Sequence, residues 1–494
     1  MNSDSTLLRS ETARVQREAR VTHGAALFLQ RALVVALLMT GSAVGQSPGG
    51  TPSAPGLRES DAGTRKDIDS APAKDPALLF PGDRGAQRMV NLARDPASRT
   101  SVTGLAESFS PDWSYWWTID EICLSLEITQ RDHAVVEALL KIRSQSRATA
   151  IEDAGKSQAA SILAQRVREL GVDLPDAEAD LATRAEFATH ASRAMSKLFA
   201  AFLLIDREFA DTCARHVLGL ESDAPSIETA SLRMERGVQR LRVFDPALSK
   251  MDILNNGVDL RIHVQPLLEH AGDQYQAVCD EIATWQQRIS PKLDVYEQRQ
   301  ADRLTVMASE QRSLESKMSQ LAVLRERTAS NRAEILASTL ESAKSIAQLV
   351  TPDDADRPLA WLRSVYHAFS PMEFGPTGGD AAIDAADRFV DEVGAEGRER
   401  KTALAQIRSS NLRVCAELEG ALVAAMVHAL QDREIGLEYV LGTGAAHKLN
   451  ERRIAQSTGV LRQVIALFPP ELHSGINHAF QARRARSYCH LSPP

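Results

Sequence analysis

The stretch FATHASRAMSKLFAAFLLIDREFADTCARHV, residues 187–217, decides the fold class of this chain. It contains neither proline nor glycine, and its apolar residues recur every three or four positions. Since an α-helix has about 3.6 residues per turn, this spacing places them on one face of a long helix, which is then buried along its length. The members of this apolar stripe are Phe187, Ala191, Met195, Leu198, Phe202, Ile205, Phe209, Cys213 and Val217.

Sequence of the same kind fills most of the chain around this stretch. Only nine prolines fall between Asp112 and Phe468, and the stretches between them are rich in Ala, Leu, Glu, Gln, Arg and Lys, which favour helices. A second long helix is predicted from about Arg398 to Asp432. No segment alternates apolar and polar residues with the period of two that a half-buried strand requires. The sequence therefore predicts an all-α fold of long antiparallel helices.

Residues 292–350 carry the spacing of a coiled coil. Apolar residues separated alternately by three and four positions form a seam between two helices. The first block is Leu304, Met307, Gln311, Leu314, Met318 and Leu321, and the second is Leu336, Leu340, Ala343, Ala347 and Val350. Each block spans only about two heptads, which is short for an autonomous dimer. Packing against another helix of the same chain is therefore favoured, and pairing with a second chain is the alternative.

The first 45 residues resemble an export signal. The uninterrupted apolar run from Ala32 to Met39 is far shorter than the roughly 20 residues that span a bilayer. Arginines precede it, and the small residues Ala43 and Gly45 follow it, as in a signal peptide that is cleaved before Gln46. We therefore expect an exported protein, periplasmic or secreted, with no stable membrane span after cleavage. An uncleaved anchor and an ordinary helix are the alternatives.

The composition after the signal divides the chain further. Residues 46–108 contain a long stretch rich in Pro, Gly, Ser and charge, and such a segment buries too little apolar surface to offset its ordering entropy. The predicted parts are a cleaved signal at 1–45, a largely disordered linker at 46–108, a long-helix region at 109–350, a C-terminal helical region at 351–486 and a tail at 487–494.

Charge and spacing exclude several classes of function. The net charge of −8 disfavours a nucleic-acid partner, which requires a basic face. The pairs His263 with His270 and His473 with His478 lack the spacing of a metal site, so no metal or cofactor is expected. The glycine-containing segment 442–448, GTGAAHK, lacks the phosphate-loop pattern and is interpreted as a turn. No catalytic residue is predicted, because no motif supplies a nucleophile or base.

Three tryptophans lie close together in the segment DWSYWW, which follows Ser110 and Pro111, a pair typical of a helix start. Trp113 and Trp117 share a helix face in this interpretation, which favours anchoring in the core. The functional alternative is an exposed aromatic contact patch formed by Trp113, Trp116 and Trp117.

The cysteines are scattered and form no CxxC pair. They are Cys123, Cys213, Cys279, Cys415 and Cys489. Burial as small apolar residues is favoured, and one or two disulfides are the alternative in an oxidising compartment.

These features favour an exported, non-catalytic helical protein that acts by protein–protein contact, as a scaffold or adaptor of the cell envelope. Its partner is expected to be another protein or a second copy of the chain, bound through helices. One alternative is a chaperone-like or ligand-binding helical protein of the periplasm, and another is an enzyme whose site is not recognised.

Overall fold

The computed structural model describes residues 102–110, 112–115, 117–170, 181–218, 224–244, 257–350, 356–369, 377–390, 397–431 and 444–488. Within these ranges every regular element is a helix and no strand occurs, which confirms the all-α prediction. The predicted signal, the linker up to residue 101 and the end of the tail lie outside the described residues.

Four helices of more than thirty residues form the framework: α8 (Leu181–Leu218), α13 (Tyr275–Ala308), α14 (Leu314–Leu349) and α17 (Gly397–Gln431). The shorter helices before α14 are α4 (Val102–Phe109), α5 (Ile119–Leu126), α6 (His133–Gly155), α7 (Gln158–Leu170), α9 (Ala224–Val243), α11 (Leu260–His263) and α12 (Gln265–Leu268). Those after it are α15 (Asp356–Phe369), α16 (Gly378–Phe389), α19 (Gly444–Ala466) and α20 (Pro470–Tyr488).

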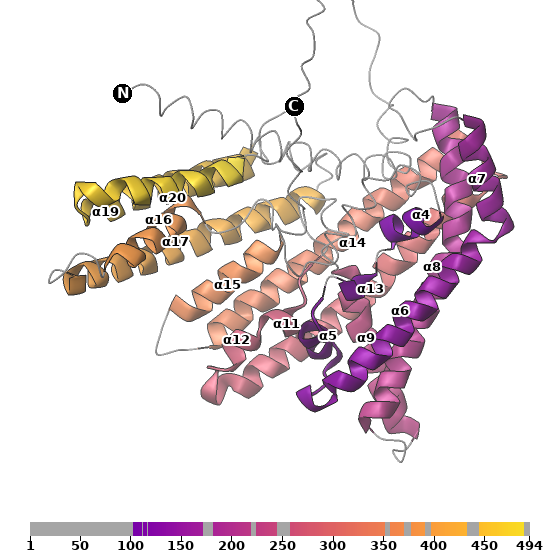
Figure 1. Ribbon diagram of the computed structural model, residues 1–494, viewed down its shortest axis with the longest axis horizontal. Coiled ribbons are helices and arrows are strands. Elements are labelled where there is room, and N and C mark those ends of the chain that lie inside the picture. Colours follow the sequence, from indigo (N-terminus) through magenta and orange to yellow (C-terminus); the bar gives the residue numbers. More distant parts are fainter. Residues whose placement is uncertain are drawn as a thin grey trace, which may run out of the picture.

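The helices form layers that follow the order of the chain, as Figure 1 shows from α7 at the right to α19 and α20 at the upper left. The helices α4, α6, α7 and α9 pack around α8, and both α8 and α9 pack on α13. α13 pairs with α14, which in turn contacts α15 and α17. α16 and α19 pack on α17, and α20 packs on α16. The extensive contacts therefore join each layer mainly to its neighbours.

The stripe of α8 explains how the first layers hold together. Phe187, Met195, Leu198 and Phe202 are buried in one apolar cluster with residues of α4 and α7. Further along the same helix, Phe209 and Cys213 are buried in a second cluster with residues of α5, α6 and α9. Ala191 is buried too, whereas Ile205 and Val217 are half-buried. The predicted helix with one buried face is thus confirmed, and it serves two apolar clusters in turn.

The largest apolar cluster surrounds the α13–α14 pair. Trp285 and Ile289 of α13 pack with Leu336 and Leu340 of α14, and the Trp285 Nε1–H donates to the Thr339 hydroxyl at 3.1 Å. The chain turns between these helices, where Ser313 caps α14 by accepting from the Ser316 N–H at 3.2 Å.

The turn divides the first block of the predicted seam. Gln311 lies in the loop between α13 and α14, whereas Leu304 and Met307 belong to α13 and Leu321 belongs to α14. The seam was predicted as continuous because the spacing alone does not reveal the Ser313 cap. The two helices pack on each other within one chain.

The helical part begins earlier than predicted. α4 covers Val102–Phe109, so helix is present within the segment 46–108 that was predicted as linker. Ser110 ends this helix instead of starting the next one, and Pro111 lies outside the described residues. α5 starts at Ile119 behind the capping box formed by Thr118 and Glu121, in which the Glu121 carboxylate accepts from the Thr118 N–H at 2.8 Å. This Thr-x-x-Glu pattern is the stronger start signal.

α5 and α9 approach each other at Gly237. A Cβ at this position would lie 2.6 Å from the Ser125 carbonyl oxygen and 3.0 Å from the Leu126 Cδ2. Buried hydrogen bonds stabilise this contact. The Ser125 hydroxyl donates to Asp259 at 2.7 Å. Arg240 also donates to Asp259, at 3.1 Å, and to the Ser125 carbonyl, at 2.6 Å. Glycine at 237 is therefore required by the small separation of the two helices.

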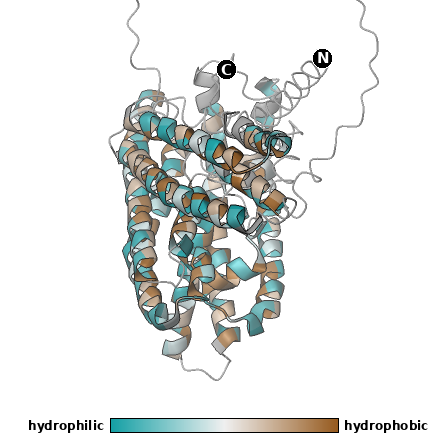
Figure 2. Cartoon of the chain, turned by 90° about the vertical axis from the view of Figure 1, so that its left-hand side faces the viewer, coloured by the Kyte–Doolittle hydropathy of each residue, from teal (hydrophilic) through white to brown (hydrophobic). Residues whose placement is uncertain are grey.

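Apolar and polar residues are interspersed along the helices, as Figure 2 shows by its alternating brown and teal segments. None of the described helices combines the length and apolar content needed to cross a membrane.

Candidate functional site

The structure describes two of the three tryptophans of the predicted contact patch, Trp113 and Trp117, and gives them different surroundings. Trp113 is fully buried; its Nε1–H donates to Asp206 at 3.3 Å and its ring packs against Phe209. Trp117 is half-buried and donates from Nε1 to the Leu241 carbonyl at 3.0 Å. Trp116 lies outside the described residues. Trp113 therefore anchors the core and cannot form part of an exposed patch in this conformation, which corrects that alternative.

Trp113 contacts a group of buried and half-buried charged residues that we call the Arg143 network. Its members are Asp112, Arg143, Arg147, Asp206, Arg242 and Glu297. The Arg143 guanidinium donates to Asp112 at 2.6 Å and to Asp206 at 2.7 Å, and it lies 4.0 Å above the Trp113 ring. Arg147 donates to the Ser110 carbonyl at 2.8 Å. The network thereby joins α6 to α8 and to the segment that precedes α5.

The second half of the Arg143 network reaches toward α13. Arg242 of α9 contacts Asp206 and donates to Glu297 of α13 at 2.7 Å. Burial alone would raise the pKa of Asp112, but the neighbouring Arg143 and Arg147 lower it to about 2. The pKa of Asp206 is lowered as well, because Arg143 and Arg242 outweigh its burial. Both carboxylates are therefore ionised at neutral pH and engaged by arginine.

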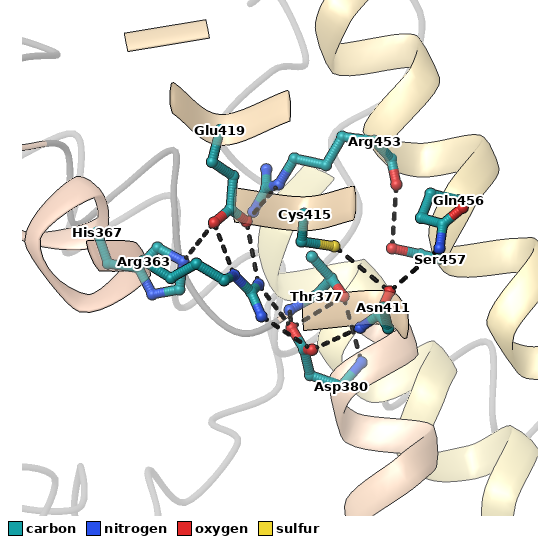
Figure 3. A network of polar contacts seen from close by, with 10 residues as sticks. All are labelled: Arg363, His367, Thr377, Asp380, Asn411, Cys415, Glu419, Arg453, Gln456 and Ser457. Atoms are coloured by element: carbon teal, nitrogen blue, oxygen red, sulfur yellow. Dashed lines mark hydrogen bonds and ion pairs between the residues drawn. The ribbon is translucent and has the colours of Figure 1, made fainter. Parts of the chain in front are cut away.

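A second group of buried charges, the Glu419 network, joins the C-terminal helices (Figure 3). Its members are Arg363, His367, Thr377, Asp380, Asn411, Cys415, Glu419, Arg453, Gln456 and Ser457. Glu419 of α17 is fully buried at its centre. Its carboxylate accepts from Arg363 of α15 at 2.9 and 3.1 Å and from Arg453 of α19 at 3.2 Å. His367 Nε2 lies 3.1 Å from the same carboxylate.

Asp380 of α16 connects this centre to a helix start. Its carboxylate accepts from the Thr377 N–H at 2.6 Å, as the N3 partner in the capping box of α16. The same carboxylate accepts from Arg363 at 3.0 and 3.3 Å and from the Asn411 amide at 2.8 Å. One residue therefore caps α16 and fixes its position against both α15 and α17.

The ion pairs of the Glu419 network make its residues poorly suited to catalysis. Burial would raise the pKa of Glu419, but the hydrogen bonds from His367 and Arg363 and the charges of Arg363 and Arg453 lower it to about 2. Burial raises the pKa of the neighbouring Cys415 thiol to about 12. A carboxylate with so low a pKa is a poor general base near neutral pH, and a protonated buried thiol is a poor nucleophile. The network is suited to positioning four helices.

Comparison with known proteins found no matching family model, no matching curated protein and no matching solved structure.

The histidines considered as metal ligands make local contacts. His270 Nδ1 lies 3.1 Å from the Pro266 carbonyl, and His473 Nε2 lies 2.7 Å from the Phe468 carbonyl. Burial lowers the pKa of His263, which favours its neutral form. Among the described residues no group of three His, Cys, Asp or Glu side chains is arranged to hold a metal ion.

α6 buries two arginines and exposes two aliphatic side chains. Its fully buried residues are Val136, Arg143 and Arg147, two of which are arginines. Ile142, directly before Arg143, is 57% exposed, and Val135 is also exposed, whereas Arg143 is only 2% exposed. We call the exposed row Val135, Ala138, Ile142, Gln145 and Thr149 the outer face of α6. This surface is the candidate contact site.

Neither the buried networks nor the outer face of α6 was predicted, although the sequence holds a signal for the two networks. Asp206 lies within the apolar stripe of α8, one turn from Phe202 and near Phe209, and Glu419 occupies a similar position one residue after Leu418. A charged residue within an apolar stripe indicates a buried ion that needs a partner. Its partner lies on another helix, which the local pattern does not identify.

Proposed function

We propose that this chain is an exported, non-catalytic helical protein that acts by protein–protein contact, as a scaffold or adaptor of the cell envelope. The observation that carries the proposal is the exposure of Val135 and Ile142 on α6, the same helix that buries Arg143 and Arg147. An isolated monomer gains nothing from this arrangement, because exposed apolar side chains lose the free energy of burial. Val135, Ala138 and Ile142 lie exposed on one side of this outer helix, where a partner can cover them.

The layered architecture supports the same function. Long helices joined by buried ion pairs, such as Arg143 with Asp206 and Arg363 with Glu419, form a layered support for an exposed surface. In this proposal residues 1–45 are a cleaved signal and the following linker tethers the helical part. The paired helices α13 and α14 are proposed to include a short coiled coil within the chain, formed by the remaining seam residues.

The contact function is tested by capture from the native envelope. The full chain is used as bait in its wild-type form, as Ile142→Glu, and as the control Leu232→Glu, which changes a comparably exposed apolar residue of α9. We expect a defined protein, or a second copy of the chain, to be retained by the wild type and by the control but lost with Ile142→Glu. Equal retention by all three forms would contradict the proposed surface.

The export component is tested separately by N-terminal sequencing of the protein recovered from outside the cytoplasm. The mature chain is expected to begin near Gln46. Recovery of a chain that still contains Arg31 would rule out cleavage. A chaperone-like role would be indicated instead if the purified chain suppressed the aggregation of unrelated unfolded proteins.

A further inference from the structure

We infer that α16 and α20 open together as one unit while the other helices stay folded, and that Asp380 holds this unit closed. The two helices lie at the upper left end of the molecule in Figure 1, in the last layer of the fold. Such an opening is independent of the contact surface proposed on α6, because no residue of α6 takes part in it.

α16 and α20 pack closely on each other at both ends of α16. A Cβ added at Gly378, the first residue of α16, would lie 2.9 Å from the ring of Phe480 in α20. A Cβ added at Gly475 of α20 would lie 3.0 Å from the ring of Phe389, the last residue of α16. Each phenyl ring therefore packs directly on a glycine of the other helix. This reciprocal contact joins two helices that are far apart in the chain.

The pair shares one apolar cluster with the neighbouring parts of α17 and α19. Ile383 of α16 and Ile476 of α20 are buried together with Leu404 of α17 and with Val460 and Val464 of α19. Among the described residues, none from α13, α14 or α15 belongs to this cluster. Those three helices share the separate cluster around the α13–α14 pair. Loss of the first cluster therefore leaves the packing of that pair in place.

The contacts of the pair are confined to its near neighbours. Of the described helices, α20 makes extensive contacts with α16 and α19 alone, and α16 makes them with α17, α19 and α20. At Gly379 the approach of α16 to α19 is close, since an added Cβ would lie 3.2 Å from the Ser457 Cα. A segment whose contacts stay within one layer can open at a lower free energy than the whole molecule.

Asp380 supplies the polar connection between this unit and its surroundings. Its carboxylate accepts from Arg363 of α15 at 3.0 and 3.3 Å and from the Asn411 amide of α17 at 2.8 Å. An ion pair of Arg408 with Asp384 also joins α17 to α16, but it is exposed, at 3.4 Å. Exposed pairs contribute little to stability, whereas hydrogen bonds between charged groups that are partly buried contribute more. Removing the charge of Asp380 should therefore favour the open state.

The closed unit covers an apolar face of α17 and α19. Leu404, Val460 and Val464 are buried in the closed state and would meet water once α16 and α20 are released. The arrangement is thus a conformational device, a removable cover at one end of the molecule. Its opening is measurable, because the backbone amides of both covering helices become accessible to solvent at the same moment.

Hydrogen–deuterium exchange of the full wild-type chain, followed by peptide mass spectrometry, tests the common opening. The slowest amides of α16 and α20 are expected to show equal protection after correction for their intrinsic rates, because one event exposes both helices. The slowest amides of α8 and α13 should exchange at least about tenfold more slowly. This measurement requires no variant, so it does not depend on the folding of a mutant.

The variant Phe480→Leu tests the coupling between the two helices. It removes part of the ring that packs on Gly378, and it should accelerate exchange about tenfold in α16 as well as in α20. The control His478→Gln, at an exposed position of α20, should exchange as the wild type does. Amides of α8 should be unchanged in both variants. Circular dichroism verifies that each variant keeps its helix content.

The role of Asp380 is tested by Asp380→Asn with Asp384→Asn as the matched control on the same helix. Asp380→Asn should accelerate exchange about tenfold in both α16 and α20, because it removes the charge that Arg363 binds. Asp384→Asn removes an exposed charge and should leave both helices as protected as in the wild type.

Three results would overturn the common opening or its latch. The first is a wild type in which α16 and α20 differ clearly in protection or are as protected as α8. The second is Phe480→Leu accelerating α20 alone or accelerating every layer equally. The third is Asp380→Asn behaving as Asp384→Asn does, which would remove Asp380 as the residue that holds the unit closed.

Discussion

The guanidinium of Arg363 donates two hydrogen bonds to the carboxylate of Glu419, at 2.9 and 3.1 Å, and so joins α15 to α17. Arg453 of α19 binds the same carboxylate from another side, at 3.2 Å. Two helices thus depend on one buried negative charge of a third helix. Such an arrangement is costly to disturb, because both buried arginines would lose the negative charge of Glu419 that balances their own.

Glu419→Gln is expected to destabilise the protein strongly. The substitution keeps the size of the side chain but removes the charge that Arg363 and Arg453 share, and breaking a buried pair in this way costs about 3–5 kcal/mol. The free energy of unfolding, measured by urea denaturation, checks the expectation. Glu417→Gln, at an exposed position of the same helix, is the control and should change stability by less than about 0.5 kcal/mol. Similar losses in both variants would contradict the role of Glu419.

Stability should fall in acid because of the buried carboxylates. In the folded state the pKa of Glu419 is about 2, below its ordinary value of 4.5, and that of Asp112 is about 2, below 3.8. The unfolded chain therefore binds more protons at low pH, so stability is full above about pH 5 and declines toward pH 2. Urea denaturation between pH 7 and pH 3 measures this decline. Glu419→Gln should show a shallower decline, whereas an unchanged slope would exclude Glu419 as a source.

Substitution by alanine should have opposite effects on stability at two glycines that lie within helices. Gly237→Ala brings a Cβ within 2.6 Å of the Ser125 carbonyl oxygen, so α5 and α9 must separate, at a cost of about 1–3 kcal/mol. Gly459 lies within α19, and a Cβ added there would meet no atom within 4 Å, so Gly459→Ala should stabilise by about 0.5–1 kcal/mol. Thermal melting of the two variants compares them directly. Stabilisation by both would contradict the close approach at Gly237.

The thiols should differ in reactivity. Burial raises the pKa of Cys123, Cys213 and Cys415 to about 12, so their reactive thiolate forms are scarce at pH 8. Cys279 is only half-buried and is free as well. Alkylation of the native protein followed by peptide mass mapping should label Cys279 before the other three, and denaturant should equalise them. Early labelling of Cys213 would show that its cluster opens readily.

The sequence predicts helices best where apolar residues repeat over many turns. The stripe from Phe187 to Val217 lies on α8, and the helix predicted from Arg398 to Asp432 corresponds to α17, with its ends shifted by one residue. In both cases the 3.6-residue period is sustained by buried residues without interruption by proline. Fold class follows from this period alone, because it requires no knowledge of which helix lies alongside.

The features that the sequence did not predict depend on contacts between segments far apart in the chain. Gln311 fits a seam by spacing, yet the cap at Ser313 ends that seam and reverses the chain. Arg363 and Glu419 are 56 residues apart, and nothing in either local pattern identifies the other as its partner. The outer face of α6 was missed for a related reason: only the burial of Arg143 reveals which side of the helix faces the protein. Local spacing therefore predicts which segments are helical but not which side chains form ion pairs between helices.

The layered order of the helices has a mechanical consequence. A load applied between the first and last layers passes through every interface in series, since few contacts bridge layers that are not adjacent. Extension would then detach the layers one after another instead of rupturing the whole molecule at once. The ion pairs of Arg143 and Glu419 lie at different interfaces, so they would break in separate steps under such a load.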